Sequence, residues 1–148
     1  LVLSRETVSV QALVEESVHH QRMVAQLQST TLDVQTVDGQ VVSVDPHLMG
    51  RLIENLVSNA LKHSPDGSTI TIRARTDAAF ELSVIDVGHG IAPAVRERLF
   101  EPFVAEQSQD AIGIGLSFCR MVAEAHGGTL SVSENQPRGS VFTFRMPL

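Results

Sequence analysis

The sequence contains no Trp, no Tyr and a single cysteine, Cys119. One cysteine excludes a disulfide within the chain and fits a reducing compartment. None of the apolar runs approaches the roughly 20 residues that span a bilayer, and no signal peptide is visible at the start. We therefore expect a cytoplasmic domain that makes no direct contact with a membrane.

Basic residues are also few, because 11 Lys and Arg stand against 17 Asp and Glu, for a formal net charge of -6. They are scattered along the chain, so no nucleic-acid-binding surface is expected. The six histidines lack the spacing of zinc ligands. The chain has 148 residues, of which 43% are hydrophobic, and this length and composition fit one globular domain. Since the first residue is Leu1 rather than Met, we expect the domain to be part of a longer protein.

Hydrophobic periodicity predicts the elements of the first half of the chain. Residues 1–9 are expected to end a preceding element, and residues 10–148 to form the domain itself. A helix is expected from about Val10 to Gln28, with Ser9 as its cap. Its expected apolar side consists of Leu13, Val14, Val18, Met23 and Leu27.

Two strands and a second helix are expected next. The strands, Thr31 to Thr36 and Gln40 to Val44, are joined through Asp38-Gly39, which is a strong turn signal. The helix begins with Asp45 as cap and Pro46 in its first turn, and it ends near His63.

The second half of the chain alternates strands and helices. The predicted segments are strands near 70–75 and 80–84, a short helix at 93–100, an aperiodic stretch at 101–112, a helix at 113–125, and strands at 130–133 and 141–146. This order predicts an α+β fold, in which the helices stack on one face of a single sheet.

The helix that ends near His63 carries polar residues along one narrow arc. At about 100° per residue, Arg51, Asn55, Asn59 and Lys62 share that arc. A solvated helix face is one interpretation. However, Asn is a poor helix former, and its amide oxygen is a hard ligand that suits Mg²⁺. Lys62 lies on the same face, where it could meet a phosphate group.

Asp86 follows a strand whose alternation turns it toward the apolar side. A buried carboxylate without a partner is costly. It could be a turn residue that bonds its own backbone, or it could accept a hydrogen bond from the amine of an adenine base. Gly88 and Gly90 would then let the backbone pass close to the flat base.

The segment Gly113-Ile114-Gly115-Leu116 opens the next predicted helix. A helix start presents free backbone N–H groups, which suit phosphate. The segment is neither a P-loop nor a dinucleotide fingerprint, because no Gly-Lys-Ser/Thr follows it and no strand leads into it. Phe100 and Phe103, at the mouth of the aperiodic stretch, are either core residues or the anchor of a lid.

These motifs together resemble the catalytic, ATP-binding domain of sensor histidine kinases, in the GHKL superfamily that also contains gyrase B and Hsp90. The resemblance covers about Val8 to Leu148, and the motifs occur in the family's order. They are Asn55 to Ser64 (N box), Asp86-Val87-Gly88-His89-Gly90 (first glycine box), Phe100-Glu101-Pro102-Phe103 (F box), and Gly113-Ile114-Gly115-Leu116 with His126-Gly127-Gly128 (second glycine box). The implied fold is a two-layer α/β sandwich, the Bergerat ATP-binding fold, with a mixed sheet under about three helices.

The resemblance also implies a role for each matching residue, with ATP and Mg²⁺ as cofactors. Asn59, helped by Asn55, would coordinate Mg²⁺, and Lys62 would contact phosphate. Asp86 would bind the adenine amine, and residues 104–112 would form a lid over the nucleotide. The remaining nucleotide-binding positions would be His63, Gly88, Gly90, Ile91, Gly113, Ile114, Gly115 and Leu116.

The chain departs from the family pattern mainly in the lid. Residues 104–112 contain no Lys or Arg, although many members of the family bring a basic residue to the terminal phosphate. Ala111 replaces a frequent glycine, and His89 replaces a common proline.

Transfer of the ATP γ-phosphate to a histidine is the activity that the resemblance implies. None of the histidines here is followed by Asp or Glu, so the acceptor would lie on a separate dimerisation domain of the same protein. Leu1 to Arg5 resembles the tail of that domain's helix. A response regulator would act downstream, and the isolated domain would be monomeric. Two alternatives remain open: a degenerate module that only binds proteins, and an anti-sigma-type serine kinase of the same superfamily.

Overall fold

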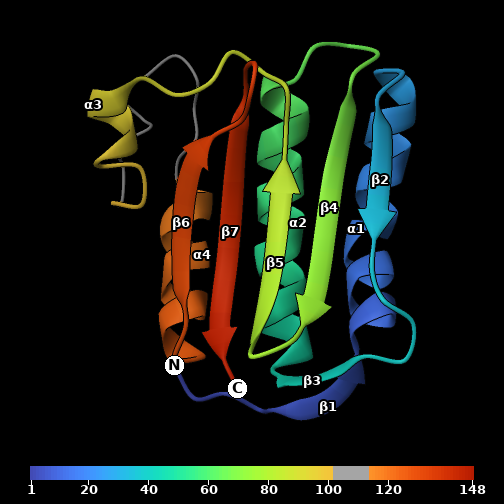
Figure 1. The fold of residues 1–148 in the computed structure, drawn as a ribbon, viewed down its shortest axis with the longest axis vertical. Coiled ribbons are helices and arrows are strands. Elements are labelled where there is room, and N and C mark those ends of the chain that lie inside the picture. The colour runs from blue at the N-terminus through green and yellow to red at the C-terminus, as the bar shows by residue number, and fades with distance from the viewer. Residues whose placement is uncertain (102–113) are drawn as a thin grey trace.

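The computed structural model describes residues 1–101 and 114–148. Seven strands and four helices follow one another along this part of the chain (Figure 1). In order they are β1 (Glu6–Ser9), α1 (Val10–Leu27), β2 (Thr31–Gln35), β3 (Val41–Val44), α2 (Pro46–His63), β4 (Thr69–Thr76), β5 (Ala79–Ile85), α3 (Pro93–Arg96), α4 (Ile114–Ala125), β6 (Thr129–Glu134) and β7 (Ser140–Pro147).

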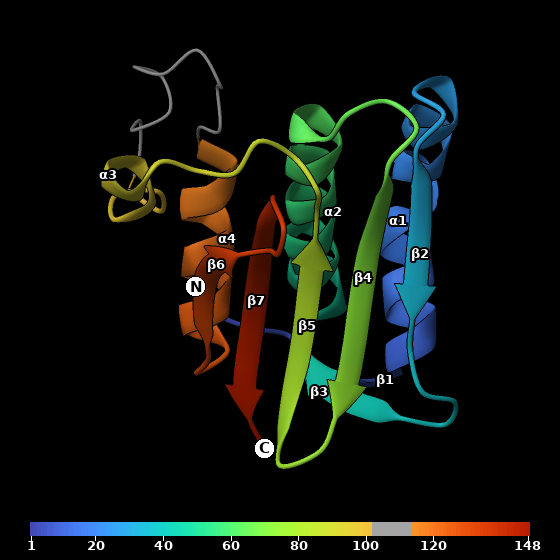
Figure 2. The ribbon, with the colours of Figure 1, turned by 45° about the horizontal axis from the view of Figure 1, so that its top comes forward.

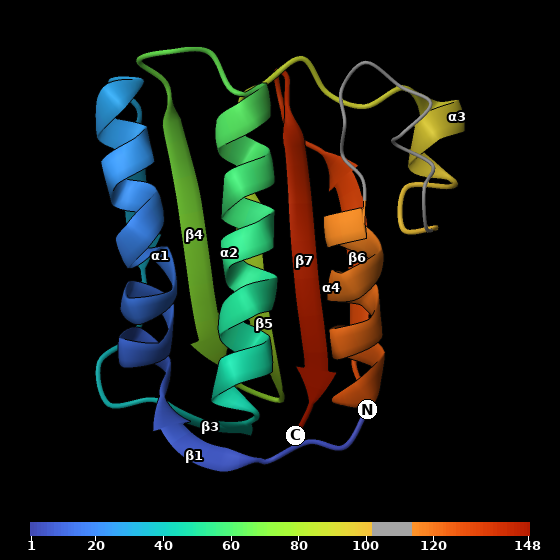
Figure 3. The same cartoon turned by 180° about the vertical axis from the view of Figure 1, so that it is seen from behind.

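Five of the strands form one mixed sheet, in the order β2-β4-β5-β7-β6. β2 and β4 are parallel, while the other neighbours are antiparallel. Helices α1, α2 and α4 cover one face of this sheet, as the view from behind shows (Figure 3). The prediction of a two-layer α+β sandwich with a mixed sheet is confirmed.

The core lies between the helices and the sheet. Strand alternation sends Ile70 and Ile72 of β4, and Leu82 and Val84 of β5, to the helix-covered face, where all four are buried. Phe144 of β7 is fully buried beside Phe80, with ring centroids 6.0 Å apart. Among the described residues, no helix has the length and apolar character needed to cross a bilayer.

Helix α2 forms as the sequence predicts. The Asp45 side chain caps it by accepting a hydrogen bond from the Leu48 N–H at 3.0 Å, and Pro46 occupies the first turn. Its apolar side is buried along the whole length: Met49, Leu52, Ile53, Leu56, Val57, Ala60 and Leu61. The narrow polar arc is therefore left facing away from the sheet.

The predicted apolar side of α1 is partly wrong. Leu13, Val14 and Val18 are buried, but Met23 is 64% exposed and Leu27 is 88% exposed. Helical geometry places Met23 and Leu27 more than a quarter turn from the centre of the buried stripe. The stripe continues instead through Ser17, Gln21 and Ala25, and the Ser17 hydroxyl donates a hydrogen bond to the Leu13 carbonyl at 2.6 Å.

The two strands predicted on either side of Asp38-Gly39 exist, but they do not pair with each other. β2 pairs with β4, whereas β3 pairs with β1 in a separate two-stranded sheet. Gly39 makes the turn with φ +80°. Residues Glu6–Ser9 therefore form a strand that the sequence did not predict, while residues 1–5 contain no helix or strand.

The predicted helix at 93–100 is shorter in the structure. α3 ends at Arg96, and residues 97–100 form turns. Ala92 provides no side-chain cap, and no residue of α3 is buried. A short helix with neither a cap nor a buried face has little to extend it.

His126 ties the start of α2 to the end of α4. Its Nε2 accepts a hydrogen bond from the Asp45 N–H at 3.0 Å, and its Nδ1 lies 2.8 Å from the Val122 carbonyl oxygen. The side chain is 2% exposed and packs edge-on against Phe144. Burial lowers the pKa of His126 below its usual value of 6.5, so the fold favours the neutral ring.

The stability of the domain is therefore expected to depend on His126 and pH. Below about pH 6.5 the His126 ring takes up a proton in the unfolded chain but not in the folded chain. The contribution of the neutral ring to folding stability is therefore complete above that pH, and it is lost as the pH falls toward the lowered pKa of the folded state. His126→Gln should lower the free energy of unfolding by about 1–2 kcal/mol at pH 7.5 and by less at pH 5.5. Urea unfolding at both pH values measures the difference.

His47→Gln is the matched control, because His47 is exposed on the first turn of α2. It should leave the free energy of unfolding unchanged at both pH values. If His126→Gln lowers the free energy of unfolding by the same amount at pH 7.5 and pH 5.5, the buried neutral ring is contradicted.

Candidate functional site

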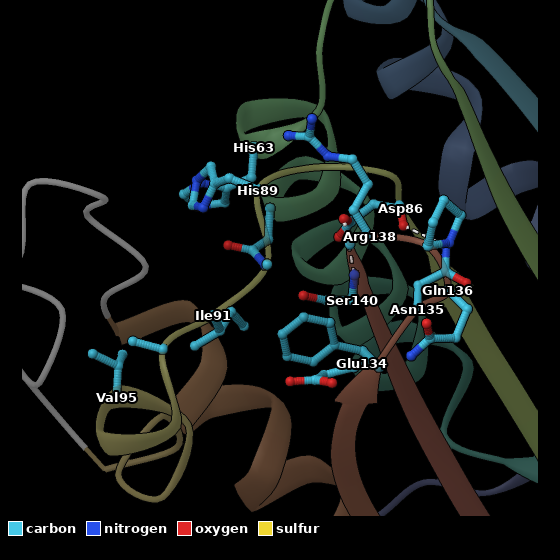
Figure 4. A pocket seen from close by; sticks show the side chains of 16 residues that line it. His63, Asp86, His89, Ile91, Val95, Glu134, Asn135, Gln136, Arg138 and Ser140 are labelled. Atoms are coloured by element: carbon cyan, nitrogen blue, oxygen red, sulfur yellow. Dashed lines mark hydrogen bonds between the residues drawn. The ribbon is translucent and has the colours of Figure 1, made fainter.

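A cavity of about 640 Å³ opens at one end of the sheet. Three segments line it: the end of α2, the connection from β5 to α3, and the loop between β6 and β7. The ends of α2 and β5 lie toward the same end of the sheet, and the start of α4 is directed there too (Figure 2). Residues far apart in the sequence are thereby brought together around one hollow (Figure 4).

Asp86 lies in this cavity and is 4% exposed, as its strand register predicts. Its Oδ1 accepts hydrogen bonds from the Gly88 N–H at 2.9 Å and the Ser140 N–H at 3.1 Å. Burial raises the pKa of the Asp86 carboxyl, although these two N–H donors and the nearby His63 and His89 act in the opposite direction. The interpretation as a turn residue is confirmed, since Asp86 bonds the backbone of its own turn. Its carboxylate also lines the cavity, and its recognition of an adenine amine stays a prediction.

The two oxygens of Asp86 have different surroundings. Both backbone hydrogen bonds end on Oδ1, which leaves Oδ2 as an acceptor for a ligand. A buried carboxylate oxygen that lines a cavity favours a ligand that offers a hydrogen-bond donor, such as an amine.

Gly88 and Gly90 shape the connection that follows. A Cβ on Gly88 would lie 2.3 Å from the His63 carbonyl oxygen, so only glycine allows this contact with the end of α2. Gly90 has φ +79° and lines the cavity together with Ile91. The close approach that the structure shows at Gly88 is to the backbone of α2, and the predicted approach to a flat base stays a prediction.

Two histidines flank the cavity. His63, at the end of α2, and His89 meet edge-to-face with ring centroids 5.3 Å apart (Figure 4). Both line the cavity near Asp86. His89, which replaces the family's frequent proline, therefore contributes a ring to this wall.

The polar arc of α2 divides between two surroundings. Asn59 lines the cavity. Asn55, one turn earlier, faces the start of α4, where a Cβ on Gly115 would lie 3.6 Å from its Oδ1. Lys62 is exposed. Arg51 stacks on the Phe118 ring, with its guanidinium carbon 4.4 Å from the ring centroid.

Helix α4 begins at Ile114, and Gly115 stands in its first turn. Leu116 is 2% exposed, so its side chain belongs to the core and only its backbone is available to a ligand. Gly113, Ala111 and the predicted lid at 104–112 lie outside the described residues, as does Phe103. Burial raises the pKa of the Cys119 thiol on this helix to about 12, which makes it inert as a nucleophile.

Apolar residues form the other side of the cavity. Ile91, Val95 and Phe142 line it, and Phe100 packs edge-on against Phe142 with ring centroids 6.3 Å apart. Phe100 is therefore half-buried against the core, next to the cavity. An apolar wall together with the buried Asp86 carboxylate suits a flat heterocyclic ring.

The sequence did not predict the part played by the β6–β7 loop. Residues 135–139 simply join the predicted strands at 130–133 and 141–146, yet Asn135, Arg138 and Gly139 all line the cavity. Two side chains of the loop donate hydrogen bonds to the backbone carbonyls of Asp86 and Gly88. The pairing of residue 86 with residue 140 on neighbouring strands brings this loop to the cavity. That pairing can be predicted only when the order of the strands in the sheet is known.

The side-chain chemistry of the site fits Mg²⁺ better than a transition metal. Within residues 1–101 and 114–148, no group of three or more His, Cys, Asp or Glu side chains is placed to hold a metal ion. Amide oxygens such as those of Asn59 and Asn55 are hard ligands, which Mg²⁺ uses alongside water and phosphate oxygens.

Comparison with known proteins agrees with this geometry. The sequence profile of the family "Histidine kinase-, DNA gyrase B-, and HSP90-like ATPase" matches residues 44–148. The chain is 34% identical over 146 residues to the sensor-like histidine kinase SenX3 of Mycobacterium bovis, a match that covers 95% of this chain and 36% of the relative. It is 35% identical over 134 residues to the adaptive-response sensory kinase SasA of Synechococcus elongatus, covering 87% of this chain and 34% of the relative.

Solved structures have the same fold. The mycobacterial sensor histidine kinase MprB superposes with a TM-score of 0.84 at 28% identity, and the match covers 97% of each chain. Full-length ShkA in complex with AMPPNP gives a TM-score of 0.88 at 24% identity, covering 99% of this chain and 32% of that one. The chain thus spans about a third of the length of the curated relatives that it matches.

Proposed function

Because this chain belongs to the histidine kinase-, DNA gyrase B- and HSP90-like ATPase family, as the catalytic, ATP-binding domain of a sensor histidine kinase, we propose that it binds ATP with Mg²⁺ and presents the γ-phosphate to a histidine on a separate domain. The observation that carries the proposal is the buried Asp86 carboxylate, which faces a cavity with one apolar wall. The AMPPNP bound to ShkA supports the choice of nucleotide.

The base would be held by Asp86 and the apolar wall. Oδ2 of Asp86 would accept a hydrogen bond from the adenine amine, while Ile91 and Phe142 would contact the ring. Gly90 would keep side-chain atoms out of the space beside the base, while Gly88 would let the turn pack against the end of α2. His63 would lie at the end of α2, along the way from the base to the phosphates.

The phosphates would lie between α2 and the start of α4. Backbone N–H groups of Ile114, Gly115 and Leu116 would face them at the positive end of the α4 dipole. Lys62 would add a positive charge from the exposed end of α2. The position of Asn55 beside Gly115 supports this arrangement, because a Cβ at position 115 would lie in ordinary contact with the Asn55 amide, 3.6 Å from Oδ1.

Asn59, with Asn55, would hold Mg²⁺. The ion, when bound, neutralises charge on the phosphates during transfer. The residues of this chain would act by binding and orienting the nucleotide, and no general base is assigned within the chain. Catalysis by positioning of this kind leaves the isolated domain a slow hydrolase.

The acceptor histidine would lie on the dimerisation domain of the same protein, and a response regulator would receive the phosphate from it. The sensor kinases similar to this chain are about three times its length, which leaves room for an acceptor domain in a protein of that kind. The test is to mix the domain with the separately produced acceptor domain of its parent protein and γ-labelled Mg-ATP. Acid-labile, base-stable label on the acceptor is the expected result.

Failure of transfer despite nucleotide binding would remove the acceptor assignment and leave the nucleotide site in place. Acid-stable label on a serine would indicate the anti-sigma type of kinase instead. Absence of nucleotide binding would indicate a module that only binds proteins.

Asn59→Ala is expected to uncouple nucleotide binding from Mg²⁺. In the wild-type domain Mg²⁺ should tighten ADP binding, because Asn59 would help to hold the ion and the ion would supply positive charge to the phosphates. In the variant, the dissociation constant for ADP should be the same with Mg²⁺ and with a chelator. Its Mg-ADP affinity should be about tenfold weaker than that of the wild type, as expected for loss of one ligand to a charged group.

Ser58→Ala is the matched control, since Ser58 is the exposed neighbour of Asn59 on α2. Calorimetry with and without Mg²⁺ should give wild-type values for this control. Retention of the full Mg²⁺ effect by Asn59→Ala would contradict the assignment of Asn59.

A further inference from the structure

The segment that carries Asp86 is held in place by contacts with other parts of the chain. Asp86 stands one residue beyond the β5–β7 register, which ends at Ile85 and Val141. Its N–H donates a hydrogen bond to the Ser140 carbonyl at 2.9 Å, which extends the ladder by one residue. After that the chain turns through Gly88 and Gly90, residues with little conformational preference of their own.

Two side chains of the β6–β7 loop donate hydrogen bonds to this turn. Asn135 Nδ2 donates to the Asp86 carbonyl oxygen at 2.8 Å, and Arg138 Nε donates to the Gly88 carbonyl oxygen at 2.9 Å. The loop that carries them is itself closed, because the Asn135 N–H donates to the Gly139 carbonyl oxygen at 3.0 Å. The two donors therefore hold carbonyls on either side of Val87.

Close packing leaves the two loops little freedom against each other. A Cβ on Gly139 would lie 2.0 Å from the Asp86 carbonyl oxygen and 2.8 Å from the Val87 Cα. On its other side, the turn abuts α2 where Gly88 meets the His63 carbonyl. The turn is thus held between α2 and the β6–β7 loop.

The orientation of the Asp86 carboxylate depends on this turn. Oδ1 is fixed by the N–H groups of Gly88 and Ser140. If the peptide at Gly88 rotates, the first of these donors moves and the carboxylate is free to turn about its side-chain bonds. The direction of Oδ2 is therefore set by whatever fixes the backbone from Asp86 to Gly88.

We infer that Asn135 and Arg138 are positioning residues for nucleotide-base recognition: they fix the turn so that Oδ2 of Asp86 meets the exocyclic amine of adenine. The inference rests on the proposed function and adds that recognition of the base amine is built by the β6–β7 loop. Losing either side chain should weaken selection for the amine more than it weakens binding of the rest of the nucleotide.

The test compares two ligands, ADP and the 5′-diphosphate of purine riboside, which lacks the exocyclic amine. The wild-type domain should bind ADP about tenfold or more tightly than the analogue, as expected for a hydrogen bond to a charged group. In Asn135→Ala and Arg138→Met this preference should fall to about threefold or less. Arg138→Lys, which keeps a cationic donor, should recover part of it.

Arg145→Met is the matched control, because Arg145 is an exposed arginine of β7 that pairs with Glu81 outside the cavity. It should keep the wild-type preference. Equal weakening of both ligands in the loop variants, or an unchanged preference, would overturn the inference and leave the two side chains a role in folding alone. A wild-type domain that binds both ligands equally would overturn the Asp86 assignment itself, and that result is distinguishable because it precedes any loop substitution.

Discussion

Replacing Asp86 by Asn is expected to weaken ADP binding about a hundredfold while the domain stays folded. The amide oxygen of Asn would take the place of Oδ1, because the N–H groups of Gly88 and Ser140 both point there. The amide nitrogen would then stand at the position of Oδ2 and oppose the adenine amine, donor against donor. Loss of a charge-assisted hydrogen bond combined with an unpaired donor accounts for about 3 kcal/mol.

The same geometry predicts a change in base preference. Inosine diphosphate carries a carbonyl oxygen where ADP has the amine, so Asp86→Asn should bind it more tightly than it binds ADP. Calorimetric titration of both nucleotides measures this, with Asp33→Asn on the edge strand β2 as the control. If Asp86→Asn keeps the wild-type affinity for ADP, the carboxylate does not recognise the base.

Replacing Gly139 by Ala is expected to have the largest effect on stability. The added Cβ would fall 2.0 Å from the Asp86 carbonyl oxygen, and the residue has φ +109°, which side chains rarely adopt. The backbone of either loop must move to accommodate it. We expect the free energy of unfolding to fall by about 3 kcal/mol and Tm by roughly 10 °C, with weaker ADP binding because the displaced atoms belong to the base site.

Gly39→Ala separates the two causes of the stability loss in Gly139→Ala, which are backbone strain at a positive φ and the clash of the new Cβ. Gly39 has a similar positive φ of +80°, but a Cβ there meets no atom within 4 Å. This control should cost about 1 kcal/mol, from backbone strain alone, and should leave ADP binding unchanged. Equal losses in Tm for the two variants would show that the contact between Gly139 and Asp86 contributes nothing beyond backbone conformation.

Helix α2 illustrates what the sequence could predict. Its cap, its first-turn proline and its unbroken apolar stripe all agree, so its position and its polar arc followed from local rules alone. Asp86 was predictable for a related reason, because strand alternation continued one residue beyond β5 and turned a carboxylate inward.

Helix α1 and strand β3 illustrate what the sequence could not predict. Met23 and Leu27 are apolar but exposed, while Ser17 and Gln21 are polar but buried, so the residue types at these positions point to the wrong face. The partners of β2 and β3 depend on contacts distant in sequence, with β4 and β1 respectively. A turn signal such as Asp38-Gly39 fixes the direction of the chain and leaves the pairing of the strands open.

The β6–β7 loop was missed for the same reason. Nothing local to Asn135 or Arg138 indicates that their partners are carbonyls of residues about 50 positions earlier. Only the strand order, in which β7 lies between β5 and β6, brings that loop over Asp86. The site is therefore predictable where a motif is continuous in sequence, and unpredictable where its support crosses the sheet.

The most direct test of the central claim is a calorimetric titration of the wild-type domain with ADP and with a non-hydrolysable ATP analogue, each with and without Mg²⁺. Calorimetry suits this chain because it contains no Trp or Tyr to report binding by fluorescence. We predict micromolar dissociation constants for both nucleotides that rise when Mg²⁺ is removed. Absence of binding to either nucleotide at millimolar concentration would contradict the account and withdraw every role assigned to the site.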